Sequence, residues 1–151
     1  EKEQYYQYTV IEEASRKRFI YAYKEQSSYS TVDFFKRAIV YFGYAPNILQ
    51  TDNGGEFTHT QKTKRIHPLD VFCNAYGIVH KTIRPRTPWH NGKVERSHRN
   101  DQERFYNHLN FYSFNDLQEQ MKRYLYRSNN IPMAVLGWKS PNKKQHELGG
   151  R

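Results

Sequence analysis

The sequence predicts one α/β domain, and three observations lead to that class. Two runs near the start, Tyr5–Ile11 and Arg18–Tyr23, are rich in tyrosine and β-branched residues, as strands are. Residues 30–42 carry apolar side chains at helical spacing. Short extended runs at 47–51 and 78–83 alternate with helical patterns, which is typical of βαβ units in a mixed sheet flanked by helices. With 151 residues, the chain is long enough to bury one core.

The first two runs predict a hairpin, and a helix is predicted to follow it. Polar residues 12–16 connect the runs, so the second run returns antiparallel to the first. Ser30 and Asp33 resemble a capping box at the start of the helix, and Gly43 ends it. The apolar face of this helix is predicted at Val32, Phe35, Ile39 and Phe42.

The middle of the chain predicts a βαβ crossover. The strand at 47–51 follows a helix, and functional groups in such units gather at the carboxyl ends of strands, where Asp52 lies. Residues 59–67 are polar and basic and predict a surface loop. Pro68–Tyr76 predicts a short helix with Gly77 as its C-cap, before the strand at 78–83.

The last third of the chain predicts two helices. Prolines end the preceding strand and require a loop as far as Gly92, after which Glu95 lies near the start of a long helix. The face of that helix is predicted at Val94, His98, Asp101 or Gln102, Phe105 and Leu109. Ser113 and Asp116 repeat the capping-box pattern before a second helix. Its apolar stripe is predicted at Leu117, Met121, Tyr124 and Leu125. We assign residues 1–141 to the core and residues 142–151 to a loose C-terminal tail.

Composition limits the classes of function. Twenty-four Lys and Arg residues against 15 Asp and Glu residues give a net charge of +9, spread along the chain, which favours a polyanionic partner. The lone cysteine, Cys73, excludes an internal disulfide, indicates a reducing compartment and is predicted to pack in the core. The histidines and this cysteine lack the paired spacing of a structural zinc site. No run approaches the roughly 18 apolar residues of a membrane span, so a cytoplasmic location is expected.

Asp52 and Glu95 are the candidates for a metal site. Phosphodiester transfer uses two divalent ions, one at the attacking oxygen and one at the leaving oxygen, and carboxylates suit Mg²⁺ or Mn²⁺. Each acid also has a structural alternative. Asp52-Asn53-Gly54 is a sequence that tight turns favour, and Glu95 can form an i,i+4 ion pair with Arg99.

Together with their flanks, these acids resemble the integrase-type catalytic core of bacterial insertion-sequence transposases, which are related to retroviral integrases. The resemblance covers nearly the whole chain. The matching segments are Tyr5–Thr9 with Ala14–Arg16, Gln50–Gly54 with Glu56 and Phe57, residues 84–98, and Asn129–Pro132 with Leu136–Pro141.

The resemblance implies a ribonuclease H-like fold, an Asp-Asp-Glu site with two Mg²⁺ or Mn²⁺ ions, and cleavage and strand transfer at transposon DNA ends. Asp52 matches the second acid and Glu95 the third. The first acid belongs to a strand before the one at Tyr5 and has no counterpart in residues 1–4. We therefore expect this chain to lack its first strand and to be inactive alone. Glu12 and Glu13 follow the first strand of this chain and are not expected to replace the missing acid.

Basic residues around the two acids are expected to contact DNA phosphates. They are Arg84, Arg86, Lys93, Arg96 and Arg99. A solvated basic face is the alternative. Asn53 and Gly54 beside Asp52, and His90 and Asn91 before Glu95, are expected to support the site, and Asn91-Gly92 is equally a helix-entry turn.

Two further functions stay open at this point. One is a non-catalytic DNA-binding or oligomerisation fragment of a decayed transposase, and the other is a nuclease that only hydrolyses DNA. The resemblance also implies a homo-oligomer, because transposition brings two DNA ends together, and a bacterial, nucleoid-associated location.

Overall fold

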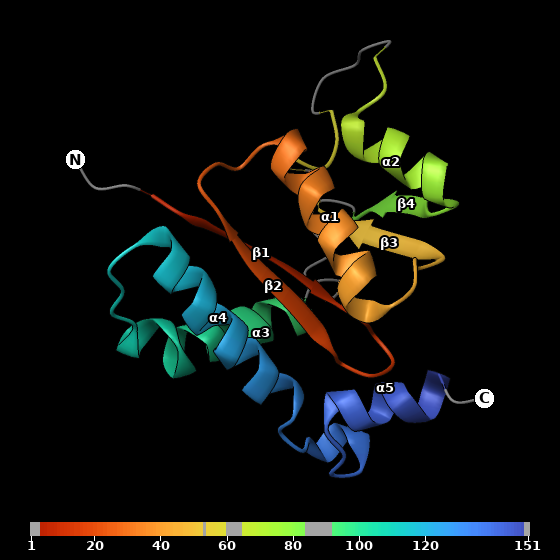
Figure 1. Cartoon of the computed structure of the whole chain (residues 1–151). Coiled ribbons are helices and arrows are strands. Elements are labelled where there is room, and N and C mark those ends of the chain that lie inside the picture. The colour runs from red at the N-terminus through yellow and green to blue at the C-terminus, as the bar shows by residue number, and fades with distance from the viewer. Residues whose placement is uncertain (1–3, 53, 60–64, 84–91, 150–151) are drawn as a thin grey trace. The chain divides into compact units, whose positions relative to one another are not determined.

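The computed structural model describes residues 4–52, 54–59, 65–83 and 92–149, and residues 92–95 by their backbone alone (Figure 1). Contacts group the chain into two compact units. The first unit comprises Glu1–Tyr8 and Tyr23–Gly92, and the second comprises Thr9–Ala22 and Lys93–Arg151.

The predicted hairpin is confirmed. Strands β1 (Tyr6–Ile11) and β2 (Arg18–Tyr23) pair with each other. In the turn between them, the backbone N–H of Glu12 donates to the carbonyl of Lys17 over 2.9 Å. Arg16 closes the turn in the left-handed region, with φ of 62°. The polar connection therefore reverses the chain, and one end of the hairpin falls in each unit.

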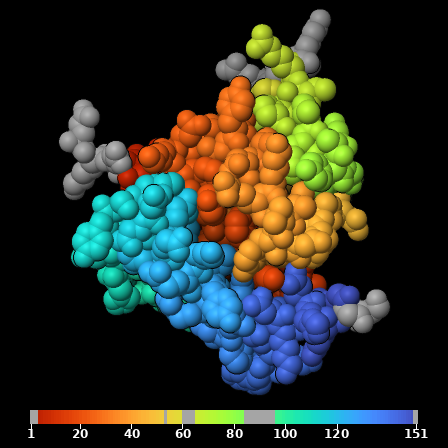
Figure 2. All heavy atoms as spheres, viewed as in Figure 1, coloured from red at the N-terminus to blue at the C-terminus, as the bar shows by residue number. Residues whose placement is uncertain are grey.

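The first unit contains the predicted βαβ crossover. Strand β3 (Ile48–Thr51) leads through helix α2 (Pro68–Tyr76) to strand β4 (Val79–Thr82), and the strands pair in parallel. Helix α1 (Ser28–Phe42) packs beside α2, and Figure 2 shows their side chains in contact. Parallel pairing places the end of β3, which precedes Asp52, beside the end of β4.

The core and caps of the first unit follow from local sequence. Phe34, Leu69 and Cys73 are buried, as predicted for Cys73. Burial raises the pKa of the Cys73 thiol to about 11, so it stays protonated. The N-cap of α1 is Ser27, whose hydroxyl accepts the Ser30 N–H, so the prediction of Ser30 as the cap is wrong. Three serines within four residues offered equivalent side chains, and burial of Ser30 decided between them.

The second unit is helical apart from its part of the hairpin. Helix α3 (Gly92–Arg104) is followed by the 3-10 turn η2 (Tyr106–His108). The expected long helix therefore ends earlier than Leu109. The buried residues of α3 include Ser97 and Asp101, and Phe105, directly after the helix, is also buried, whereas His98 is exposed. Of the two residues that the periodicity allowed, Asp101 faces inward.

Helix α4 (Phe114–Asn129) agrees with its prediction. Ser113 is its N-cap and accepts the Asp116 N–H, and the side chains of the predicted stripe, Leu117, Met121, Tyr124 and Leu125, are buried. The amides of Gln118 and Asn129 lie against β2. Each accepts from a backbone N–H of β2 and donates to the carbonyl of the same residue, Ala22 and Arg18 respectively. These amides satisfy backbone groups of β2 as a neighbouring strand would.

The C-terminal segment differs from its prediction. After the 3-10 turn η3 (Ala134–Leu136), residues 142–149 form most of helix α5 (Pro141–Gly149) and are not a loose tail. Ser140 explains the difference, because its hydroxyl accepts the Lys143 N–H and Pro141 begins the helix. Gln145 also accepts a hydrogen bond from Lys17 Nζ over 2.8 Å. The assignment of residues 1–141 as one core stays a prediction.

Among the described residues, the strands form two two-stranded sheets, the hairpin β1–β2 and the parallel pair β3–β4. They supply both kinds of pairing that the predicted mixed sheet requires. None of the described helices combines the length and apolar character that a membrane span needs.

Candidate catalytic site

Asp52 directly follows β3 and has an exposed side chain. Its Oδ1 accepts the backbone N–H of Gly54 over 2.7 Å, which is the tight turn weighed as its structural alternative. The turn and a functional role are compatible, because the turn engages one oxygen. Among the described residues, nothing donates a hydrogen bond to Oδ2 of Asp52.

Gly54 supports the Asp52 turn by lacking a side chain. A Cβ at this position would lie 2.7 Å from Oε1 of Glu56. The Glu56 carboxylate is itself held by the Gln26 amide, over 3.0 Å. The carbonyl of Gly54 accepts the N–H groups of Phe57 and Thr58, which folds the loop back on itself. Glycine at position 54 therefore allows the turn and the Glu56 carboxylate to pack together.

A chain of polar side chains lies under the end of β3. Asp70 Oδ1 is 2.7 Å from His80 Nδ1, and His80 Nε2 is 2.7 Å from the hydroxyl of Thr51. The Thr51 hydroxyl also lies 3.0 Å from the carbonyl of Asp52. The His80 side chain is 6% exposed, whereas the Asp70 side chain is 40% exposed, so the chain runs from the surface to a buried imidazole. It joins α2, β4 and β3 at the residue before Asp52.

His67 fastens the loop after Asp52 to helix α2. Its Nδ1 accepts the Leu69 N–H over 3.1 Å as the N-cap of α2, so the ring proton resides on Nε2. Nε2 can then donate to the carbonyl of Gly55, 3.0 Å away. His67 is 3% exposed, and both ring nitrogens are used. Sequence reasoning assigned this residue to a surface loop and missed its role, because its partner lies 12 residues earlier.

Glu95 lies in the first turn of α3, as predicted, and its side chain is outside the described part of the structure. Arg96 and Arg99 are exposed on the same helix, and Lys93 is described by its backbone alone. The remaining predicted residues, Asn53, Arg84, Arg86, His90 and Asn91, fall outside the described residues. Asp52 belongs to the first unit and Glu95 to the second. Their convergence on one site stays a prediction, as does the ion pair of Glu95 with Arg99.

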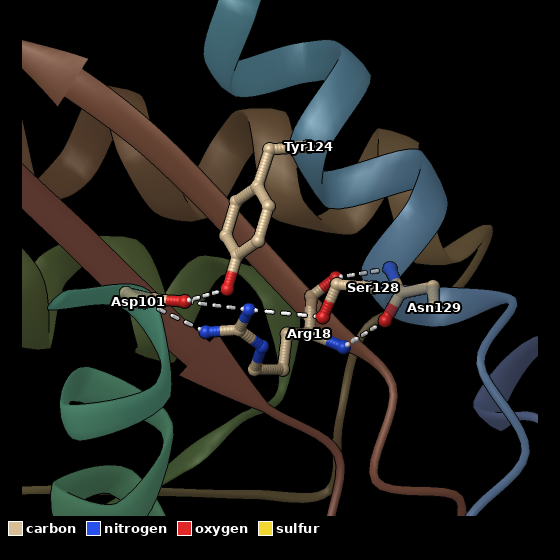
Figure 3. Close-up of polar contacts among 5 residues, drawn as sticks. All are labelled: Arg18, Asp101, Tyr124, Ser128 and Asn129. Carbon is tan, nitrogen blue, oxygen red and sulfur yellow. Dashed lines mark hydrogen bonds and ion pairs between the residues drawn. The ribbon is translucent and has the colours of Figure 1, made fainter. Parts of the chain in front are cut away.

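A buried ionic cluster in the second unit anchors α3 (Figure 3). The Arg18 guanidinium from β2 makes two contacts with Asp101 from α3, Nη1 to Oδ2 over 2.9 Å and Nη2 to Oδ1 over 2.8 Å. The Tyr124 hydroxyl from α4 donates to Oδ1 of Asp101 over 2.6 Å. Ser128 accepts from Nη2 over 3.0 Å. Both oxygens of Asp101 are engaged, and the helix that carries Glu95 is thereby tied to β2 and α4.

The electrostatics of this cluster follow from burial and pairing. Burial lowers the pKa of Arg18, but its hydrogen bond with Asp101 and the charge of that carboxylate outweigh burial, so the pKa is raised overall. Burial and the nearby carboxylate raise the pKa of Tyr124 to about 12. Arg18 is therefore charged and Tyr124 protonated at neutral pH. Sequence reasoning missed the cluster, because a strand arginine shows its partner only in the tertiary structure.

No group of three or more His, Cys, Asp or Glu residues forms a ready metal cage within the described ranges. The described donor that suits a hard cation near β3 is the Asp52 carboxylate, which is exposed and half-engaged.

Comparison with known proteins decides the family. The sequence profile of the integrase core domain matches residues 1–88, and a second integrase core domain profile matches residues 76–141. The chain belongs to the integrase core family. This confirms the resemblance found in the sequence.

Relatives of this integrase core come from a virus and from plants. A putative integrase of Spiroplasma virus SpV1-C74 is 30% identical over 134 residues, which are 83% of this chain and 37% of the viral protein. The Pol polyprotein of transposon TNT 1-94 from Nicotiana tabacum is 34% identical over 93 residues, 60% of this chain and 6% of the polyprotein. The chain thus spans a minor part of either relative. A bacterial insertion-sequence origin stays a prediction.

Solved structures share the fold. The HTLV-2 integrase catalytic core domain in complex with magnesium has a TM-score of 0.71 at 21% identity, covering 94% of this chain and 85% of that chain. A chain of the simian T-cell lymphotropic virus intasome, solved in complex with the PP2A regulatory subunit B56 gamma, has a TM-score of 0.75 at 20% identity, covering 94% of this chain and 48% of that one. The predicted ribonuclease H-like α/β class is confirmed by these neighbours.

Proposed function

We propose that this integrase core cleaves DNA ends and joins them to target DNA in a reaction that depends on Mg²⁺ or Mn²⁺. The observation that carries the proposal is the Asp52 carboxylate, which ends a parallel strand, is exposed and has one oxygen outside its turn. Membership of the integrase core family supports the same reaction.

Asp52 and Glu95 are the residues proposed to hold the metal ions. Carboxylate oxygen is the donor that Mg²⁺ and Mn²⁺ prefer, so the chemistry of the described donor fits. Bound divalent ions supply activation of the attacking oxygen and stabilisation of the leaving oxygen. The magnesium in the HTLV-2 integrase core structure is consistent with this choice of ion.

The residues around Asp52 hold it in place. The Gly54 N–H fixes the direction of Oδ1 of Asp52. The Asp70–His80–Thr51 chain fixes Thr51, the residue before Asp52. Neither contact uses Oδ2, which remains for a ligand. A carboxylate that is orientated before the ligand binds loses less conformational entropy on binding, which is the general advantage of a preorganised site.

DNA is the proposed substrate, and its phosphates are proposed to meet Arg84, Arg86, Lys93, Arg96 and Arg99. The described members of this set, Arg96 and Arg99, are exposed on α3, as such a role requires. A homo-oligomer is proposed because joining needs two DNA ends, and the HTLV-2 catalytic core has been solved in a dimeric and in a trimeric form. The inactivity of residues 1–151 on their own stays a prediction.

The test is Mn²⁺-dependent joining of a pre-cut DNA end by the longest natural form of the protein. Glu95→Gln is compared with Glu103→Gln, an exposed glutamate on the same helix with the same change of charge. We expect Glu95→Gln to abolish joining and Glu103→Gln to retain it. Equal joining activity of both variants would contradict the role of Glu95. If the natural protein hydrolyses DNA but does not join it, the result would indicate a nuclease.

A further inference from the structure

The second unit contains a cavity with an unusual set of charges. It has a volume of about 170 Å³ and is lined by three arginines, one histidine, one glutamine and two apolar side chains. The cations are Arg104, Arg123, Arg127 and His108. The cavity lies between the end of α3, the turn η2 and the exposed side of α4. None of these residues belongs to the proposed carboxylate site. We call it the arginine cavity.

The apolar floor of the arginine cavity is held by packing and hydrogen bonds within the second unit. Phe105 is 7% exposed, and its ring stacks on the Tyr124 ring with centroids 4.9 Å apart. Tyr124 is in turn fixed by its hydrogen bond to Asp101 in the buried cluster (Figure 3). The backbone N–H of His108 donates to the Phe105 carbonyl, which sets η2 against the end of α3. The cations therefore surround a floor that is positioned before any ligand binds.

The cations of the arginine cavity have no acidic partners among the described residues. No ion pair joins Arg104, Arg123 or Arg127 to a described carboxylate. Asp116 accepts a hydrogen bond from Gln120, which lines the cavity, but Asp116 does not line the cavity itself. Arg123 and Arg127 are four residues apart on α4, a spacing at which like charges repel. Glu119, four residues before Arg123, forms no ion pair with it among the described contacts.

We propose that the arginine cavity binds a phosphoryl group, supplied by the backbone of DNA away from the carboxylate site. Guanidinium groups are planar donors that match phosphate oxygens, and a concave site with several of them collects an anion from solution. The apolar floor of Phe105 and Leu109 removes water from beneath the ligand, which strengthens the interaction. This inference rests on DNA being the substrate, and free polyphosphate offers the same chemistry.

The experiment measures binding of a labelled DNA duplex by fluorescence anisotropy at several salt concentrations. Arg123→Gln and Arg127→Gln are compared with Lys122→Gln, an exposed residue on the same helix that does not line the cavity. All three lose one positive charge, so general attraction changes equally. We expect each arginine variant to bind about tenfold more weakly than the control. We also expect the slope of log affinity against log salt to fall by about 0.9 per arginine.

Two further measurements separate the explanations. Thermal unfolding is expected to be unchanged or slightly raised in Arg123→Gln, because repulsion is removed, whereas a purely structural arginine would lower it. Inorganic pyrophosphate is titrated as a competitor. If pyrophosphate displaces the duplex from the natural protein but not from Arg123→Gln, free polyphosphate is a ligand of the cavity. Displacement that is equal in the natural protein and Arg123→Gln, and tracks ionic strength, would indicate that free polyphosphate is not a ligand of the cavity and that the backbone phosphate of DNA is.

The proposal is overturned if Arg123→Gln and Lys122→Gln bind duplex and pyrophosphate with the same affinity and the same salt slope. Failure of the natural protein to bind any duplex is a different outcome. It would overturn the proposed function. Calorimetric titration of pyrophosphate into the natural protein and into Arg123→Gln, which needs no duplex, would still decide whether the cavity is an anion site.

Discussion

Two aspartates in this molecule have opposite surroundings. Asp101 in the second unit is 1% exposed, and both of its oxygens are taken by Arg18 and Tyr124. Asp52 in the first unit is exposed, and one oxygen is held by the Gly54 N–H. The difference distinguishes the carboxylate that holds the fold together from the one that we propose as a metal ligand. An acid whose oxygens are all engaged stabilises the fold, and an acid that is orientated through one oxygen is available to a ligand.

The largest effect on stability is expected at Asp101. Asp101→Asn leaves the Arg18 guanidinium buried without a counter-charge, so we expect the free energy of unfolding to fall by about 3–5 kcal/mol. Denaturant titration measures this. The double variant Arg18→Met with Asp101→Leu removes both charges and should be less destabilised than Asp101→Asn. A loss below about 1 kcal/mol in Asp101→Asn would show that the cluster is not structural.

Alkaline pH is expected to weaken the same cluster. The pKa of Tyr124 is raised from 10.0 to about 12 in the folded chain, first by burial and then by its hydrogen bond to Asp101. A pKa raised by folding gives stability that is fully present below pH 10 and is lost as the pH rises towards 12. The loss is on the order of 2 kcal/mol. Tyr124→Phe should flatten this part of the pH profile, and an unchanged profile would contradict the assignment.

The polar chain beneath Asp52 is expected to matter less for folding. Thr51→Val removes the hydroxyl that meets His80 and the carbonyl of Asp52, and leaves a shielded ring nitrogen without a partner. We expect a loss of about 1–2 kcal/mol in unfolding free energy, together with slower joining. Thr58→Val, in the loop beyond Gly54, is the matched control. Unchanged joining in Thr51→Val would mean that this chain does not position Asp52.

The smallest effect is expected for the exposed pair on α1. Arg37 lies 2.8 Å from Asp33, four residues earlier, and both side chains are about half exposed. Arg37→Gln should lower the unfolding free energy by about 0.3–0.5 kcal/mol, and high salt should remove the difference. A larger loss of unfolding free energy would mean that an exposed ion pair stabilises this fold as strongly as the buried pair of Arg18 and Asp101.

The sequence predicts the parts of the fold that local patterns determine. The hairpin, helix α2 with its Gly77 cap, and the buried stripe of α4 all lie where periodicity and capping place them. The cluster of Arg18 with Asp101 could not be predicted in this way, because its partners are 83 residues apart. Asn129 shows the same limit. Its buried amide pairs with the backbone of Arg18, 111 residues away.

The candidate site divides in a similar manner. Asp52 could be located because a strand end, a turn-forming sequence and a family motif coincide there. The residues that hold it, His80 and His67, act through contacts between elements, and no local pattern marks them. The arginine cavity likewise combines three elements, although each arginine is visible in the sequence as an ordinary surface charge.

The most direct test compares Asp52→Asn with Asp101→Asn in two assays, denaturant unfolding and Mn²⁺-dependent joining of a pre-cut DNA end. Asparagine at position 52 can still accept the Gly54 N–H, so the turn is kept while the metal ligand is lost. We predict that Asp52→Asn unfolds within about 0.5 kcal/mol of the natural protein and loses joining by about a thousandfold or more. Retained joining in Asp52→Asn, or destabilisation equal to that of Asp101→Asn, would contradict the account.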